Sequence, residues 1–195
     1  MAPPLPWLKP AVLVGGLAPL GILLVRASTD ALGANAVQNG LNQLGLLALL
    51  LLLASLVCTP LKRHLGWTWP LRIRKTLGVL AFAHAALHAL TYVALDQGFA
   101  WRTLGEDLLE RPFILVGFLA LALLVPLAWT STSGAVRRMG FAAWQRLHRL
   151  VYPAAILAVV HFFLRVKSDV SEPLVYAGVL AVLLAARLGA LRASR

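Results

Sequence analysis

Six long apolar stretches alternate with short polar segments along the chain. The stretches cover residues 11–26, 41–58, 76–95, 112–129, 149–166 and 173–191. Each is close to the roughly 20 residues that an α-helix needs to cross the hydrocarbon core of a bilayer. Helices are favoured there because hydrogen bonds within one helix satisfy the backbone polar groups where water is absent. The pattern predicts an all-α integral membrane protein, a six-transmembrane-helix bundle that forms a single domain over residues 1–195.

Proline-containing pairs mark the ends of several stretches. We expect Thr59-Pro60 to close the second helix, Arg111-Pro112 to open the fourth and Glu172-Pro173 to open the sixth. Proline commonly lies at the boundary between a helix and a turn. The first stretch, preceded by Lys9 and followed by Ala27-Ser28, also resembles a signal peptide. Its removal would leave five helices, so we expect an uncleaved first helix.

Composition supports a membrane environment. Apolar residues make up 60% of the chain and charged residues 13%, and the mean hydropathy is +0.81, whereas soluble domains have about a quarter of their residues charged. Cys58 is the single cysteine. It excludes an intramolecular disulfide and an iron–sulfur cluster held by several thiolates.

The net charge of +11 is distributed unevenly between the two sides of the predicted bundle. The side with both termini, the 59–75 loop and the 130–149 segment holds 13 of the 18 Lys and Arg residues. The other side holds the remaining five and all seven acids, which are Asp30, Asp96, Glu106, Asp107, Glu110, Asp169 and Glu172. Lys and Arg accumulate in cytoplasmic loops, so both termini are predicted to be cytoplasmic, and the charge indicates membrane orientation rather than nucleic-acid binding. The acids at 106–110 are either ordinary solvated charges or a strip that steers a partner.

Three histidines, His84, His88 and His161, lie inside apolar stretches, where an ionisable residue indicates function because its burial in lipid is costly. The third and fifth helices are predicted to run in the same direction. His88 lies 13 residues beyond Lys75, and His161 lies 13 residues beyond His148, so both are about 20 Å along their helices. Two imidazoles at one depth on facing helices can bind one haem from its two faces.

Other interpretations of these histidines remain open. Each could form an interhelical hydrogen bond, and His84 with His88, at i and i+4, also resembles a divalent-metal pair, although no acid lies within a predicted span. We favour His88 over His84 as the haem ligand. His148 is either a ligand of a second haem or a residue that binds a propionate, a flavin or a partner, and Pro153 could kink the helix between His148 and His161.

The motifs taken together resemble the ferric-reductase-like transmembrane superfamily, most strongly the MsrQ (YedZ) family. They are Thr59-Pro60-Leu61, residues 72–78 (RIRKTLG), Leu87-His88, Trp129-Thr130-Ser131, residues 144–152 (WQRLHRLVY) and His161. The ordered combination covers essentially the whole chain. By this resemblance His88, His148 and His161 are the haem-associated histidines, and Arg74 also falls in the family pattern. NADPH-oxidase relatives carry two histidines on the third helix that are about one haem-to-haem spacing apart. This chain departs from that pattern, so the resemblance leaves open whether it binds one haem or two.

The resemblance implies haem b and FMN as cofactors and an electron-transfer role in the bacterial inner membrane. Electrons from the quinone pool or from a cytosolic flavin reductase would pass to a periplasmic, molybdopterin-containing reductase of the MsrP type. Methionine sulfoxide repair would take place on that partner, and we expect no catalytic residue in this chain. The alternatives are a ferric-reductase-type haem protein with another acceptor and a histidine-based metal transporter.

Overall fold

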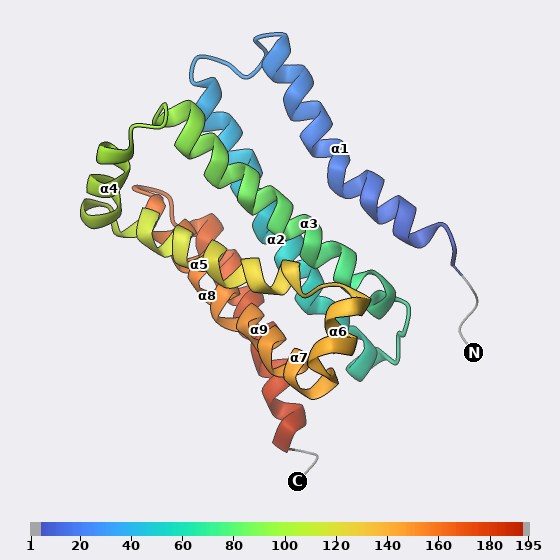
Figure 1. Ribbon diagram of the computed structural model, residues 1–195. Helices are drawn as coiled ribbons and strands as arrows, with labels where there is room; N and C mark the ends of the chain where they lie inside the picture. The colour runs from blue at the N-terminus through green and yellow to red at the C-terminus, as the bar shows by residue number, and fades with distance from the viewer. Residues whose placement is uncertain (1–4, 193–195) are drawn as a thin grey trace.

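The computed structural model describes residues 5–192 as a bundle of helices, and these residues contain no β-strand. Its α-helices are α1 (Leu8–Ser28), α2 (Ala36–Leu65), α3 (Pro70–Thr91), α4 (Trp101–Glu110), α5 (Pro112–Trp129), α6 (Ser133–Met139), α7 (Phe141–Leu147), α8 (Val151–Arg165) and α9 (Ser171–Arg192) (Figure 1). A π-helical segment, η1 (Tyr92–Asp96), extends α3, and a 3₁₀ turn, η2 (His148–Leu150), joins α7 to α8.

Five segments of the described chain are long and apolar enough to cross a membrane: Leu8–Ser28, Ala36–Leu65, Pro70–Asp96, Pro112–Trp129 and Phe141–Arg165. They contain the first four predicted stretches and all but the last residue of the fifth, so the prediction of a multi-pass all-α membrane protein is confirmed at this level. The sixth stretch, 173–191, falls on α9, and its membrane crossing stays a prediction, as does the side on which the termini lie. Arg195, which we counted on the basic side, lies outside the described residues.

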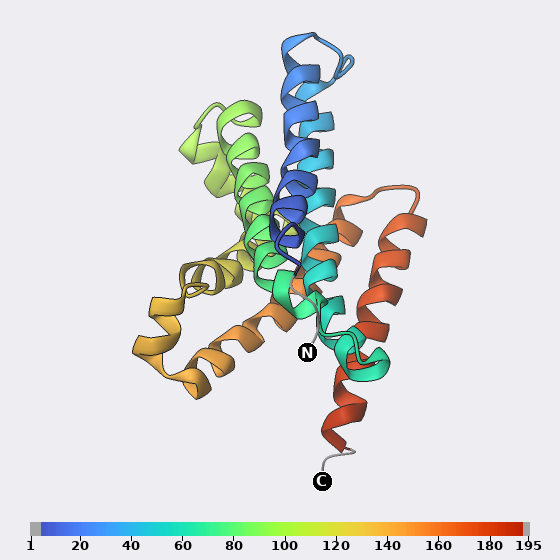
Figure 2. The ribbon, with the colours of Figure 1, turned by 90° about the vertical axis from the view of Figure 1, so that its right-hand side faces the viewer.

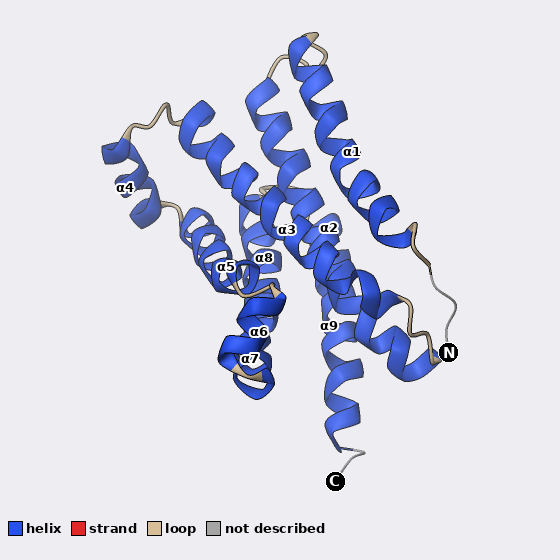
Figure 3. Ribbon diagram, turned by 45° about the vertical axis from the view of Figure 1, so that its right-hand side comes forward, coloured by secondary structure: helices blue, strands red, loops and turns tan. Residues whose placement is uncertain are grey.

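Successive long helices run in opposite directions, so the connections gather at two ends of the bundle (Figures 1 and 3). The α4 end contains α4, the connection 29–35 and the connection 166–170. The α7 end contains α6, α7 and the connection 66–69. Figure 2 shows α9 on the opposite side of the bundle from α6 and α7. The α3 and α8 helices therefore run in the same direction, from the α7 end to the α4 end.

The apolar core lies between two antiparallel helix pairs, α2 with α3 and α5 with α8. Leu52 and Leu56 of α2 pack there with residues that include Ala81 of α3, Leu124 of α5 and Ala154 of α8. Leucine and valine side chains remain exposed on the outer surfaces of the helices. Such surfaces suit a lipid environment, because lipid tails are as apolar as the side chains they contact.

Proline does not end α2, so the prediction that Thr59-Pro60 closes the second helix is wrong. The helix continues to Leu65 and ends at Gly66, whose φ of 70° lies in the left-handed region that glycine adopts easily. Pro60 has no N–H to donate to the carbonyl of Leu56, but Nη2 of Arg187 donates to that carbonyl at 2.7 Å. A side chain from α9 thus satisfies the group that the proline leaves unpaired. The other two boundaries are confirmed, since α5 begins at Pro112 and α9 at Ser171.

Candidate functional site

The imidazole rings of His88 and His161 lie next to each other between α3 and α8. Their ring centroids are 6.0 Å apart, and the ring planes are nearly perpendicular at 81°. Both residues lie in the halves of their helices that are nearer the α4 end, as their equal distances from the basic segments predict. The tertiary structure thus brings together two side chains that are 73 positions apart in the sequence.

Each ring is held by a hydrogen bond to the backbone of the neighbouring antiparallel helix. Nδ1–H of His88 donates to the carbonyl of Leu41 on α2 at 2.9 Å, and Nδ1–H of His161 donates to the carbonyl of Phe113 on α5 at 2.6 Å. A carbonyl can only accept, so the proton must be on Nδ1 in both rings. Nε2 of each ring is then left with its lone pair, which is the form of histidine that binds a metal ion.

Two glycines make room for these rings. Gly45 lies four residues after Leu41, and a Cβ added to it would be 3.2 Å from Nδ1 of His88. Gly117 lies four residues after Phe113, and a Cβ added there would be 2.8 Å from Nδ1 of His161. Each ring reaches its carbonyl across the surface that the missing side chain leaves free. We did not identify either glycine from the sequence; the shared spacing from the accepting carbonyl appears only after the helices are paired.

The donor set fits an axially ligated haem. Two imidazoles that ligate one metal ion through bonds of about 2 Å have ring centres about 6 Å apart, which agrees with the observed separation. Within the described residues, no group of three or more His, Cys, Asp and Glu side chains could hold a metal ion. A porphyrin supplies four ligands of its own and needs only two axial ones.

His84 is not part of this pair, although it lies one turn from His88 on the same helix. Its side chain is fully buried, and its Nδ1–H donates to the carbonyl of Leu80 in its own helix at 2.9 Å. Its Nε2 is buried without a hydrogen-bond partner among the described residues. The structure therefore separates the role of His84 from that of the paired rings.

His148 lies at the α7 end, in the 3₁₀ turn before α8. Its ring stacks on Trp144 with centroids 4.0 Å apart, and its Nε2 lies 3.1 Å from Oγ1 of Thr130. The hydroxyl proton of Thr130 is already donated to the carbonyl of Pro126 at 2.6 Å, so Nε2 of His148 must be the donor. Pro153 lies in the first turn of α8, which begins after the turn that carries His148.

Arg74, the fourth predicted site residue, is also at the α7 end. It is exposed, and its Nη1 donates to Oγ1 of Thr59 at 3.2 Å. It acts electrostatically on His148. The structure therefore divides the predicted site residues into a half-buried pair near one end, His88 and His161, and a second group at the other, His148 and Arg74.

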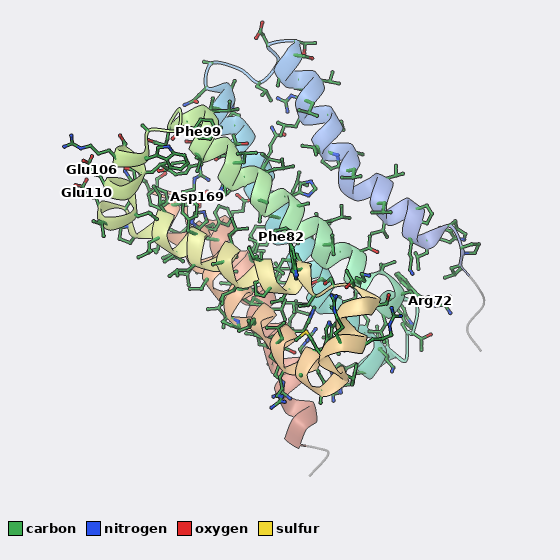
Figure 4. All side chains as sticks on the ribbon, viewed as in Figure 1. Arg72, Phe82, Phe99, Glu106, Glu110 and Asp169 are labelled. Atoms are coloured by element: carbon green, nitrogen blue, oxygen red, sulfur yellow. The ribbon has the colours of Figure 1, made fainter. Side chains whose placement is uncertain are left out.

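The three acids of the 106–110 segment, which lie in α4, differ in environment. Asp107 is 5% exposed, accepts a hydrogen bond from the hydroxyl of Tyr92 at 2.5 Å and forms an ion pair with Arg111 at 3.0 Å. Glu106 and Glu110 are exposed and point away from the bundle (Figure 4). Asp107 thus links α4 to η1 and to the start of α5, and of these three acids Glu106 and Glu110 are the surface charges.

Comparison with known proteins gives a consistent result. Residues 40–159 match the family described as "ferric reductase like transmembrane component". The "protein-methionine-sulfoxide reductase heme-binding subunit MsrQ" of Rhodospirillum rubrum is 51% identical over 178 residues, 91% of this chain and 86% of that protein. The protein of the same name from Deinococcus radiodurans is 52% identical over 186 residues, 95% of this chain and 92% of its own length.

A third protein of that name, from Caulobacter vibrioides, is 47% identical over 167 residues, 86% of this chain and 80% of its own length. No solved structure matches the chain. Identity of this extent over nearly the full length of three relatives, together with the family match, leads to one conclusion. The chain belongs to the MsrQ family of ferric-reductase-like transmembrane proteins.

Proposed function

We propose that the chain is the haem b electron-transfer subunit of a membrane system that reduces methionine sulfoxide in oxidised proteins. The observation that carries the proposal is the pair His88 and His161. Their ring centroids are 6.0 Å apart, and Nδ1–H of each ring donates to a backbone carbonyl. The names of the relatives, which describe heme-binding subunits of a methionine-sulfoxide reductase, support the same function.

In this proposal His88 and His161 would hold one haem iron through their Nε2 atoms. The haem supplies one-electron transfer. The protein holds the two imidazoles in the tautomer that presents Nε2, and Gly45 and Gly117 let the rings approach the backbone that orients them. His148 is the residue that we assign to a second haem, if the protein binds two.

The orientation follows from the charge pattern. We infer six transmembrane helices in the bacterial inner membrane, with the basic α7 end in the cytoplasm and the acidic α4 end in the periplasm. The histidine pair would then lie in the periplasmic half of the membrane. This position suits electron delivery to a periplasmic reductase of the MsrP type, which would carry out the repair.

The donor side is assigned by family resemblance. Electrons would enter from the quinone pool or from a cytosolic flavin reductase, and FMN would be a further cofactor. The exposed basic residues of the α7 end, which include Arg72, Arg74 and Lys75, are suited to an anionic flavin or donor protein because they provide an electrostatic attraction for it.

Histidine variants provide the direct test. His88→Ala and His161→Ala should each lose most of the bound haem, because one axial ligand and its fixed tautomer are removed. We expect partial loss for His148→Ala and little for His84→Ala. Haem-to-protein ratios and absorption spectra of the purified full-length chain measure these outcomes. His64→Ala is the matched control, since His64 is an exposed residue in the last turn of α2 and its replacement should leave the spectrum unchanged.

Two results would contradict the proposal. A wild-type chain that shows no Soret band after expression with added haem would exclude a haem protein. Unchanged spectra in both the His88→Ala and the His161→Ala variants would exclude the assigned ligands. A separate measurement addresses the partner: reduced haem should be reoxidised by a periplasmic molybdopterin reductase only when methionine sulfoxide is present.

A further inference from the structure

Arg165 lies close to the histidine pair. It is the last residue of α8, one helical turn beyond His161, and it is half-buried. It follows His161 by four residues, so the two side chains lie on the same face of α8, and its positive charge acts electrostatically on His161 and on His88. The positive charge therefore lies on the side of α8 that carries His161.

No anion of the described chain accompanies this charge. The ion pairs found there are Arg102–Glu106 and Arg111–Asp107, and Arg165 itself has no hydrogen bond or ion pair with a described residue. Asp169, four residues further along the chain, instead accepts a hydrogen bond from the backbone N–H of Ser171 at 2.9 Å. A guanidinium binds a carboxylate through two parallel charge-assisted hydrogen bonds. Its position one helical turn from His161 therefore makes Arg165 available to an anion that is supplied by a ligand at the histidine pair.

The ligand of the proposed function has such groups. Haem b carries two propionate side chains, and a guanidinium binds a carboxylate with strong charge-assisted hydrogen bonds. We propose that Arg165 binds a propionate carboxylate of the haem that is held between His88 and His161. This inference rests on the proposed function, because it requires haem at that site. It assigns to Arg165 a positioning role in addition to the two axial ligands.

Two consequences follow from this role. The ion pair holds the haem in place, so its loss accelerates haem release. A nearby positive charge also favours the reduced iron, which carries one positive charge less than the oxidised iron. Loss of Arg165 should therefore lower the reduction potential of the haem. A residue that only packed against the rings would not produce a change in potential that depends on its charge.

The test compares Arg165→Gln with Lys167→Gln in the full-length chain. Both substitutions remove one positive charge, but Lys167 is exposed in the connection after α8. Transfer of haem to apomyoglobin gives the release rate, and a spectroelectrochemical titration gives the reduction potential. We expect Arg165→Gln to release haem about tenfold faster, as the loss of one charged hydrogen bond implies, and to have a lower potential. Lys167→Gln should match the wild type in both measurements.

Reconstitution with haem dimethyl ester identifies the anion, since its propionates are esterified and uncharged. With this haem, the wild type and Arg165→Gln should release haem at the same rate. Equal release rates with ordinary haem would overturn the proposal, as would a tenfold difference that persists with the ester. These outcomes are distinct from failure of the proposed function, in which the wild-type chain itself would bind no haem.

Discussion

The two ends of α8 carry histidines that the structure treats in different ways. At the α4 end, His161 donates from Nδ1 to a backbone carbonyl and leaves Nε2 available. At the α7 end, His148 donates from Nε2 to the hydroxyl of Thr130. A glycine, Gly117, faces the ring of His161, whereas a tryptophan, Trp144, covers the ring of His148. The ring of His161 is therefore held in place with Nε2 available, whereas Nε2 of His148 is already used in a hydrogen bond.

The comparison indicates that the neighbours of a histidine at membrane depth decide whether its Nε2 is available to a ligand. His161 has the ring of His88 beside it, while the α3 residue that acts electrostatically on His148 is an arginine, Arg74. His88 has the same two neighbours as His161, a glycine and an accepting backbone carbonyl, and both are on α2. The following predictions test whether this difference between the two ends is real.

The largest effect is expected for Gly117→Ala. The added Cβ would be 2.8 Å from Nδ1 of His161, so the ring must move and lose its hydrogen bond to Phe113. Overpacking of this kind costs about 3 kcal/mol, which corresponds to roughly hundredfold weaker haem binding. A haem titration of the purified apoprotein measures the change. Wild-type affinity in this variant would mean that the glycine has no part in placing the ring.

A smaller effect is expected for Gly45→Ala. The added Cβ would be 3.2 Å from Nδ1 and Cε1 of His88, a distance that a shift of a few tenths of an ångström can relieve. The cost should be about 1 kcal/mol, or roughly fivefold in haem affinity, measured in the same titration. If Gly45→Ala were more damaging than Gly117→Ala, the ranking of the two contacts would be wrong.

Thr130→Val should affect the α7 end alone. The substitution removes the acceptor for Nε2–H of His148 at nearly constant volume, and the lost hydrogen bond is worth about 1 kcal/mol. We expect a slightly lower melting temperature and full retention of the haem that depends on His88 and His161. Absorption spectra and thermal unfolding in detergent measure these two quantities. Loss of that haem would show that the two ends are coupled.

Gly178→Ala provides the control for both glycine variants and should have the smallest effect. Gly178 lies within α9, and an added Cβ would meet no atom within 4 Å. Alanine is the better helix former by about 1 kcal/mol at such positions, so thermal stability should stay the same or rise slightly and haem affinity should not change. A clear loss of haem would indicate that the effects at Gly45 and Gly117 are not local.

The sequence predicted the helices better than their ends. The stretch 112–129 coincides with α5, because an apolar segment bounded by Arg111-Pro112 and by a polar run has clear limits. Thr59-Pro60 was misleading, since the carbonyl that Pro60 leaves unpaired is satisfied by Arg187, 127 residues further along the chain. A hydrogen bond between distant segments cannot be read from a local pattern.

Within the site, the sequence determined which residues could act, and the tertiary structure decided how. Counting along two helices of equal direction placed His88 and His161 at one depth, because the rise per residue of an α-helix is constant. The accepting carbonyls of Leu41 and Phe113 and the glycines that face the two rings depend on the rotation and pairing of helices. The rotation and pairing of the helices are set by packing across the bundle. The sequence does not determine them, because apolar residues occur on all sides of these helices.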